Sequence, residues 1–326
     1  MHRRTACLAA PLMAATAWQA RAQPASRPAR IAYVWMYSSG PSAPYPDAFS
    51  ARMRELGWRE GRDVVITHHD AKGDPAQLAS IAQQLVREPV DVILATCTPE
   101  ARAMRQVTTT IPIVMVATGD PVLAGLVESL ARPGTNVTGI STMSLVLSSK
   151  RVALLREAFP AVRQATVLWN PQRADNQAEV TTMQAAATRV GMQMRSAQVR
   201  TVEELDTQLD AIGWDGTQAL LTAGDNLVSS RRKAIVDRAA ALRMPAIYED
   251  RLLVEAGGLM SFGPDLRRTH ARGADYVDRI LKGAKPSELP IEQPTRFDLV
   301  VDLRVARAQK LDIPRSVLLQ ADEVLR

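Results

Sequence analysis

Two short polar stretches in the middle of the chain carry residue types that could bind a small charged molecule. Thr96-Cys97-Thr98-Pro99 follows the apolar run Val90–Ala95, and Thr118-Gly119-Asp120-Pro121 follows the apolar run Ile111–Ala117. Threonine hydroxyls and the free N–H groups at a helix start suit a carboxylate, whereas a carboxylate such as Asp120 suits an ammonium group. The same side chains could instead cap the helices that follow. Neither stretch is arranged for covalent chemistry, so the chain is interpreted first as a receptor.

A third polar stretch has the same position relative to an apolar run. Ala219–Ala223 breaks into Gly224-Asp225-Asn226, which places Asp225 and Asn226 at the end of a predicted strand. Loops at the carboxyl ends of parallel strands are where α/β folds bind ligands. We therefore expect both side chains to contact a ligand, although aspartate and asparagine also favour such positions for turn formation alone.

Cys97 carries the alternative interpretation, an exported enzyme of the racemase or decarboxylase type. A cysteine beside a helix N-terminus is expected to have a lowered pKa, which favours the reactive thiolate. A two-base racemase needs a second cysteine, and only Cys7 is present besides Cys97. His68 and His69 follow a neighbouring predicted strand, so a Cys–His pair stays open. Nucleotide-binding, metalloprotease and nucleophile-elbow motifs are absent from the sequence, and we expect no cofactor and no metal.

The elements that position these loops form two α/β repeats. Strands such as Arg30–Met36 and Val64–His69 alternate with helices up to about residue 141, and a second alternating set begins near Leu147 and ends near Phe262. This pattern predicts two doubly wound Rossmann-like lobes, residues 29–141 and 142–263, with a hinge and a ligand cleft between them. Residues 264–326 hold a long helix, a Pro-containing crossover and a last strand and helix, which we expect to complete the two lobes.

The first residues differ from the rest in composition. Residues 1–22 contain Arg3 and Arg4, an apolar run from Ala6 to Ala17 and the small-residue site Ala20-Arg21-Ala22, which predicts a signal peptide cleaved after Ala22. Three of the 40 Lys and Arg residues and none of the 34 Asp and Glu residues lie in it, so the mature chain carries a net charge of +3. Basic and acidic residues are interspersed, which argues against a nucleic-acid partner.

Several longer segments resemble one known family. They are ARMRELGWREGRDV from Ala51, TIPIVMVATGDPVLAGLVESLARPGTNVTGIS from Thr110, GGLMSFGPD from Gly257 and YVDRILKGAKPSELPIEQPTRFDLVVDL from Tyr276. In this order they resemble the tryptophan/tyrosine-type solute-binding proteins of ABC transporters over nearly the whole mature chain. The resemblance implies a type I periplasmic-binding-protein fold, location in the periplasm, and import of a small polar solute, such as an amino acid, through a permease and an ATPase. We expect a monomer.

The resemblance also implies a set of pocket residues, all in loops that follow strands. Asp225 is implied as the partner of an α-amino group, and Thr96 and Thr98 as partners of a carboxylate. Cys97 stands where the family usually has glycine, and the first loop is unusually rich in proline and serine. A receptor for a membrane sensor, rather than for a permease, stays open. The implied ligand-binding residues are Tyr37, Ser38, Ser39, Thr96, Cys97, Thr98, Thr118, Asp120, Asn170, Asp225, Asn226 and Glu249.

Overall fold

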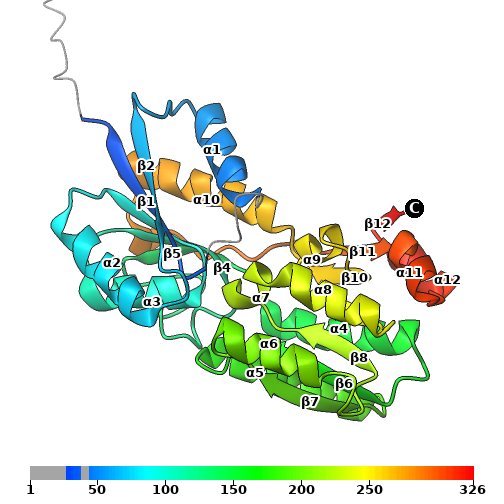
Figure 1. Ribbon diagram of the computed structural model, residues 1–326. Helices are drawn as coiled ribbons and strands as arrows, with labels where there is room; N and C mark the ends of the chain where they lie inside the picture. The colour runs from blue at the N-terminus through cyan, green and yellow to red at the C-terminus, as the bar shows by residue number, and fades with distance from the viewer. Residues whose placement is uncertain (1–26, 38–43) are drawn as a thin grey trace, which may run out of the picture.

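The computed structural model describes residues 27–37 and 44–326, which form two α/β lobes (Figure 1). The predicted signal peptide, Ser38 and Ser39 lie outside the described residues. Within the described residues, no helix is long and apolar enough to cross a membrane.

The first lobe contains a five-stranded parallel sheet in the order β2-β1-β3-β4-β5. Alternate side chains of β1 enter different cores, because successive residues of a strand point to opposite faces. Tyr33 and Trp35 pack with α1 and α10, whereas Ala32 and Val34 pack with α2 and α3. The elements of this lobe are β1 (Ala29–Trp35), α1 (Tyr45–Glu55), β2 (Val64–Asp70), α2 (Pro75–Arg87), β3 (Val92–Ala95), α3 (Thr98–Val107), β4 (Ile113–Thr118), β5 (Val137–Ser141), α10 (Leu266–Leu281) and the short 3₁₀ helix η1 (Pro286–Glu288).

The second lobe contains a seven-stranded sheet in the order β12-β11-β10-β9-β8-β6-β7, in which only the β10–β11 pair is antiparallel. Helices α4 and α5 cover one face, and α6 and α8 cover the other. Its elements are α4 (Ser144–Ala158), β6 (Gln164–Trp169), α5 (Ala174–Arg189), β7 (Gln193–Gln198), α6 (Val202–Ala211), β8 (Ala219–Thr222), α7 (Asn226–Ser230), α8 (Arg232–Ala241), β9 (Ala246–Tyr248), α9 (Arg251–Glu255), β10 (Met260–Gly263), β11 (Asp298–Asp302), α11 (Leu303–Gln309), α12 (Arg315–Gln320) and β12 (Glu323–Leu325).

The C-terminal segment is shared between the lobes. In Figure 1 the chain returns from β10 to the first lobe as α10, drawn in orange beside α1, and then re-enters the second lobe as β11. On the way, Glu292 forms an isolated parallel bridge with Ile140 of β5. Segments far apart in the sequence therefore connect the lobes, as in binding proteins that close by a hinge motion.

The helix predicted to begin at Pro121 is not formed. Residues 121–125 are turns, and Asp120 accepts hydrogen bonds from the Val122 and Leu123 N–H groups at 3.0 and 2.9 Å. Gly125 has a φ of +68°, a left-handed conformation that ends the turn where a helix would continue. Asp120, for which ligand contact and helix capping were both left open, therefore closes a tight loop.

Gly139 of β5 offers a test of how closely the first sheet is packed. Its φ is +128°, and a Cβ atom added there would lie 2.0 Å from the Met115 carbonyl oxygen of β4. Gly139→Ala should therefore cost about 3–5 kcal/mol of stability, because strain and overpacking add. Gly191, with φ +71° and no atom within 4 Å of its added Cβ, is the control. Gly191→Ala should cost only about 1–2 kcal/mol in urea unfolding, and equal losses would contradict the argument.

Candidate functional site

Two cavities lie between the lobes. The inner cavity, with an accessible volume of about 70 Å³, is formed by both lobes. The outer cleft, of about 340 Å³, lies beside α2 and α3 and is also formed by both lobes. The inner cavity includes Trp35, Tyr45, Cys97, Arg151, Glu179, Asp225, Glu249, Asp250 and His270 in its lining, and the outer cleft includes Tyr37, Arg102, Gln106, Asn170 and Gln172. Cys97, Arg173, Asp225 and Asn226 line both spaces and so form the wall between them.

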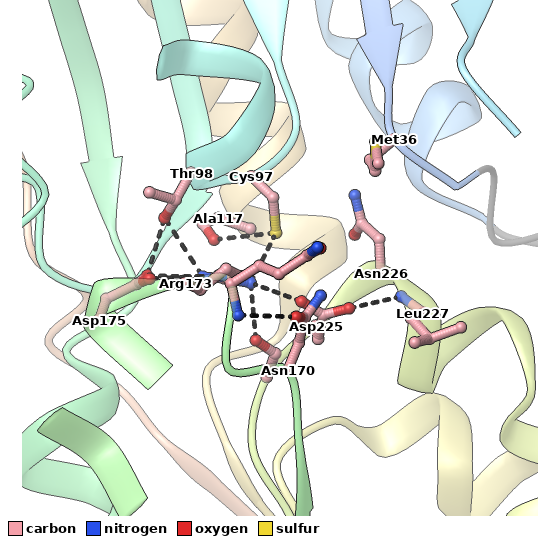
Figure 2. Close-up of polar contacts among 12 residues, drawn as sticks. Met36, Cys97, Thr98, Ala117, Asn170, Arg173, Asp175, Asp225, Asn226 and Leu227 are labelled. Carbon is pink, nitrogen blue, oxygen red and sulfur yellow. Dashed lines mark hydrogen bonds and ion pairs between the residues drawn. The ribbon is translucent and has the colours of Figure 1, made fainter. Parts of the chain in front are cut away.

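Arg173 is the centre of this wall. It follows β6, and its side chain is only 4% exposed. Figure 2 shows it reaching from the second lobe toward Thr98 of the first. Its Nη2 donates to Asp175 Oδ2 at 2.6 Å and to Thr98 Oγ1 at 3.2 Å, and its Nη1 donates to the Gly224 carbonyl at 2.8 Å. Nη1 also lies 3.4 Å from Asp225 Oδ2. The guanidinium group thus holds two buried carboxylates and the first lobe in one network.

Thr96 and Thr98 were predicted to lie in a loop at the cleft. Both side chains form hydrogen bonds with the second lobe. Thr98 Oγ1 donates to Asp175 Oδ2 at 2.8 Å, and Thr96 Oγ1 accepts from Asn226 Nδ2 at 3.2 Å. Asn226 Nδ2 also donates to Glu100 Oε1 at 2.8 Å, and Thr96 Oγ1 donates to the same oxygen at 2.8 Å. Neither threonine caps α3, whose N-cap residue is Cys97 and makes no side-chain cap. The hydroxyl groups therefore join the two lobes by hydrogen bonds.

Asp225 has two roles in this network. Its Oδ1 accepts from the Leu227 N–H at 2.8 Å, which makes it the N-cap of α7, and its Oδ2 faces Arg173. Burial raises the pKa of Asp225, although the Arg173 charge opposes that rise. Asp175, held by the same guanidinium group, has a lowered pKa despite its burial. The charges at the wall are therefore stabilised chiefly by Arg173.

The thiol of Cys97 does not have the lowered pKa that its position suggested. Burial raises its pKa to about 12, because Arg173 only partly compensates for the loss of water around a thiolate. Sγ lies 3.5 Å from the Ala117 carbonyl and 3.6 Å from Arg173 Nη1. His69 bonds to Thr67, and the His68 ring lies 5.3 Å from that of Tyr33, so neither forms the Cys–His pair that stayed open. A nucleophilic thiolate is not favoured here.

The remaining residues predicted to bind the ligand are spread over different places. Glu249 lines the inner cavity, and Tyr37 and Asn170 line the outer cleft. Thr118 is buried without lining either cavity, and Asp120 lies at a separate surface pocket beside Val146. The structure thus brings Thr96, Cys97, Thr98, Asn170, Asp225, Asn226, Glu249 and Tyr37 to the space between the lobes, and leaves Thr118 and Asp120 outside it.

Sequence reasoning missed the buried charges. Arg173 and Asp175 could have been noticed, since Asn170-Pro171-Gln172-Arg173 follows a strand end just as the predicted loops do. Arg151 and Glu179 lie on α4 and α5, form an ion pair and are 2% and 1% exposed. Residues at such spacing on two helices carry no local pattern that marks them as a pair.

A cluster of three ring side chains from the first lobe, Trp35, Tyr45 and His270, lines the same inner cavity. The His270 ring of α10 stacks on Tyr45 and Trp35 at centroid distances of 4.8 and 5.8 Å. Burial lowers the pKa of His270 to about 3, so the ring is neutral. The Tyr45 hydroxyl donates across the lobes to Asp250. Among the described residues, no three histidine, cysteine, aspartate or glutamate side chains are grouped as a metal site would require.

Comparisons with known proteins agree with the two-lobe fold. A family model described as ABC transporter substrate binding protein matches residues 45–325. A tyrosine-binding protein of Clostridioides difficile (strain R20291) is 25% identical over 278 residues, which are 84% of this chain and 80% of that protein. A solved ABC domain from Streptococcus pneumoniae in complex with L-Trp is 25% identical, with a TM-score of 0.83, covering 91% of this chain and all of that one. A conserved domain protein from Vibrio cholerae O1 is 30% identical with a TM-score of 0.83, covering 91% of this chain and 99% of that one.

Proposed function

Because the chain belongs to the family of ABC transporter substrate-binding proteins, we propose that it captures a small polar solute outside the cytoplasm and delivers it to a membrane permease. The single observation that carries this proposal is a cavity between two lobes whose walls are joined by hydrogen bonds across the cleft. A ligand that touches both walls favours the closed form, since only that form makes all of its contacts. A permease then recognises the closed surface.

The solute is an amino acid or a similar molecule. The tyrosine-binding relative and the relative solved with L-Trp support this class. In this chain, Asp225 Oδ2 accepts from the α-amino group, beside Arg173, and the loop that contains Thr96 and Thr98 faces the carboxylate. The protein is exported through residues 1–22, cleaved after Ala22, and acts as a monomer with a permease and an ATPase. Mass spectrometry of the exported protein tests the cleavage, and sedimentation tests the monomer.

The proposal is tested by thermal unfolding of the exported protein after a denaturing wash, against amino acids, aromatic acids, purines and small peptides. A ligand at 100 times its Kd should add about 2.7 kcal/mol to the free energy of unfolding. We expect one chemical class to raise the unfolding midpoint and to be recovered unchanged. Conversion of the compound, abolished by Cys97→Ser, would instead support the enzyme interpretation. Absence of any shift across all classes would contradict solute capture.

The role of Asp225 is tested by Asp225→Asn, which keeps an oxygen to cap α7 but removes the charge. An amine-bearing ligand should bind at least tenfold more weakly, because a charged hydrogen bond contributes about 1.5–3 kcal/mol. Asp237→Asn is the control, since Asp237 has a 57% exposed side chain on α8 of the same lobe. Titration calorimetry measures both affinities. An unchanged affinity in Asp225→Asn would remove Asp225 from the ligand contacts.

A further inference from the structure

Two carboxylates of the inner cavity have oxygen atoms without hydrogen-bond donors. Glu179 is only 1% exposed, and its Oε2 has no partner. Oε1 of Glu249 is also buried and without a partner, while its Oε2 accepts from the Thr222 hydroxyl. Both residues line the inner cavity. Because buried polar groups in native proteins are normally hydrogen-bonded, these two acceptors indicate a donor that the protein itself does not supply.

Acidic side chains outnumber basic ones in the lining of the inner cavity, which includes Glu179, Asp225, Glu249 and Asp250 but only two arginines, Arg151 and Arg173. Arg151 pairs with Glu179, whereas the donors of Arg173 are directed to Asp175, the Gly224 carbonyl, Thr98 and Asp225. Within the described part of the chain, Glu249 forms no ion pair. Burial raises the pKa of Glu249 and raises that of Glu179 to about 7. A cation placed between these carboxylates would offset the cost of their burial.

The first lobe contributes uncharged aromatic side chains to the inner cavity. These are Trp35, Tyr45 and His270, whose rings are stacked. An ammonium group is attracted to a ring face that the stack leaves uncovered, and more strongly where water is excluded. The His270 ring is neutral, so it does not repel a positive charge. Acidic side chains and aromatic rings thus surround one small space.

We propose that the inner cavity holds an alkylammonium group at the side-chain end of the solute, with Glu249 and Glu179 as its acceptors and the Trp35–His270–Tyr45 rings as its aromatic wall. This inference rests on the proposed function, in which Asp225 accepts from the α-amino group. The solute is then a short aliphatic amino acid with a second ammonium group. The accessible volume of about 70 Å³ fits a slender chain, since it is small beside the roughly 300–1,000 Å³ of drug-sized ligand pockets.

The experiment is titration calorimetry of the exported protein with L-ornithine and with L-norleucine, which has a methyl group where ornithine has the ammonium group. L-ornithine should bind at least tenfold more tightly than L-norleucine. Glu249→Gln keeps an oxygen for Thr222 and should weaken L-ornithine at least tenfold without changing L-norleucine. Glu255→Gln is the matched control, because it removes the same charge from α9 of the same lobe outside the cavity, and it should leave both affinities unchanged.

Several results would overturn the inference. They are equal binding of the two ligands, tighter binding of L-norleucine, L-tyrosine or L-tryptophan, absence of L-ornithine binding, and an equal effect of Glu249→Gln and Glu255→Gln. Binding of a neutral amino acid or of another solute class would overturn the ammonium site and leave solute capture intact. If the proposed function itself were wrong, the outcome would be different, because no solute of any class would then raise the midpoint of thermal unfolding.

Discussion

Arg173→Met should lower the free energy of unfolding by about 3–5 kcal/mol, the usual cost of removing one partner of a buried ion pair. The substitution leaves the carboxylates of Asp175 and Asp225 buried without their cation, and both side chains are 5% exposed or less. It also removes the hydrogen bonds to the Gly224 carbonyl and to Thr98. The loss of stability should therefore arise both within the second lobe and at the contact between the lobes.

Urea unfolding measures this effect, with Arg189→Met as the control. Arg189 is exposed at the end of α5, in the same lobe, and its replacement should change stability by less than about 0.5 kcal/mol. A loss in Arg173→Met no larger than in the control would show that Asp175 and Asp225 do not depend on the guanidinium charge.

The second large effect is expected at the ion pair of Arg151 and Glu179. Arg151→Met should cost about 3–5 kcal/mol, because Glu179 is then buried without a cation. The double variant Arg151→Met, Glu179→Leu removes both charges and should recover most of that loss, since a buried pair is often no better than apolar side chains of similar volume. The recovery should be measured in a double-mutant cycle by urea unfolding.

The cost of Arg151→Met should also depend on pH. The pKa of Glu179 is raised to about 7, chiefly by burial and also by Glu249 and Asp175, while Arg151 and Arg173 oppose the rise. A carboxyl group with a raised pKa binds more protons in the folded state, so its contribution to stability is present below pH 4.5 and is lost as the pH rises through about 7. Without Arg151 its pKa rises further, so the variant should lose more stability at pH 8 than at pH 5.

The exposed pair of Lys233 and Asp237 on α8 provides the comparison for this cycle. Its side chains are 73% and 57% exposed, and such pairs contribute about 1 kcal/mol or less. Lys233→Met should therefore change stability little, and equally at both pH values. A double variant at Arg151 and Glu179 that is no more stable than the single one would contradict the assignment of the loss to an unpaired carboxylate.

Local patterns in the sequence were enough to predict the two α/β lobes and several helix starts. The strand predicted at Arg30–Met36 forms as Ala29–Trp35, and Asp74 caps α2 by accepting from the Ala76 N–H. Secondary-structure predictions failed for short segments whose local sequence is compatible with more than one conformation. The turn after Pro121, where a helix was expected, is one such segment, and α12 and β12 were not predicted.

The sequence by itself determined that the loops after β3 and β8 reach the cleft, because strand ends, glycines and N-cap residues act over a few neighbours. The same pattern was wrong for Thr118 and Asp120, which lie outside the cleft. In the loops after β3 and β8 it placed Thr96, Thr98, Asp225 and Asn226 at the space between the lobes. Only the tertiary structure decided what these side chains meet. Arg173 lies 52 residues from Asp225, and Arg151 lies 28 residues from Glu179. Their pairing, and with it the pKa of each buried acid, depends on how two sheets pack and close, for which no local pattern exists.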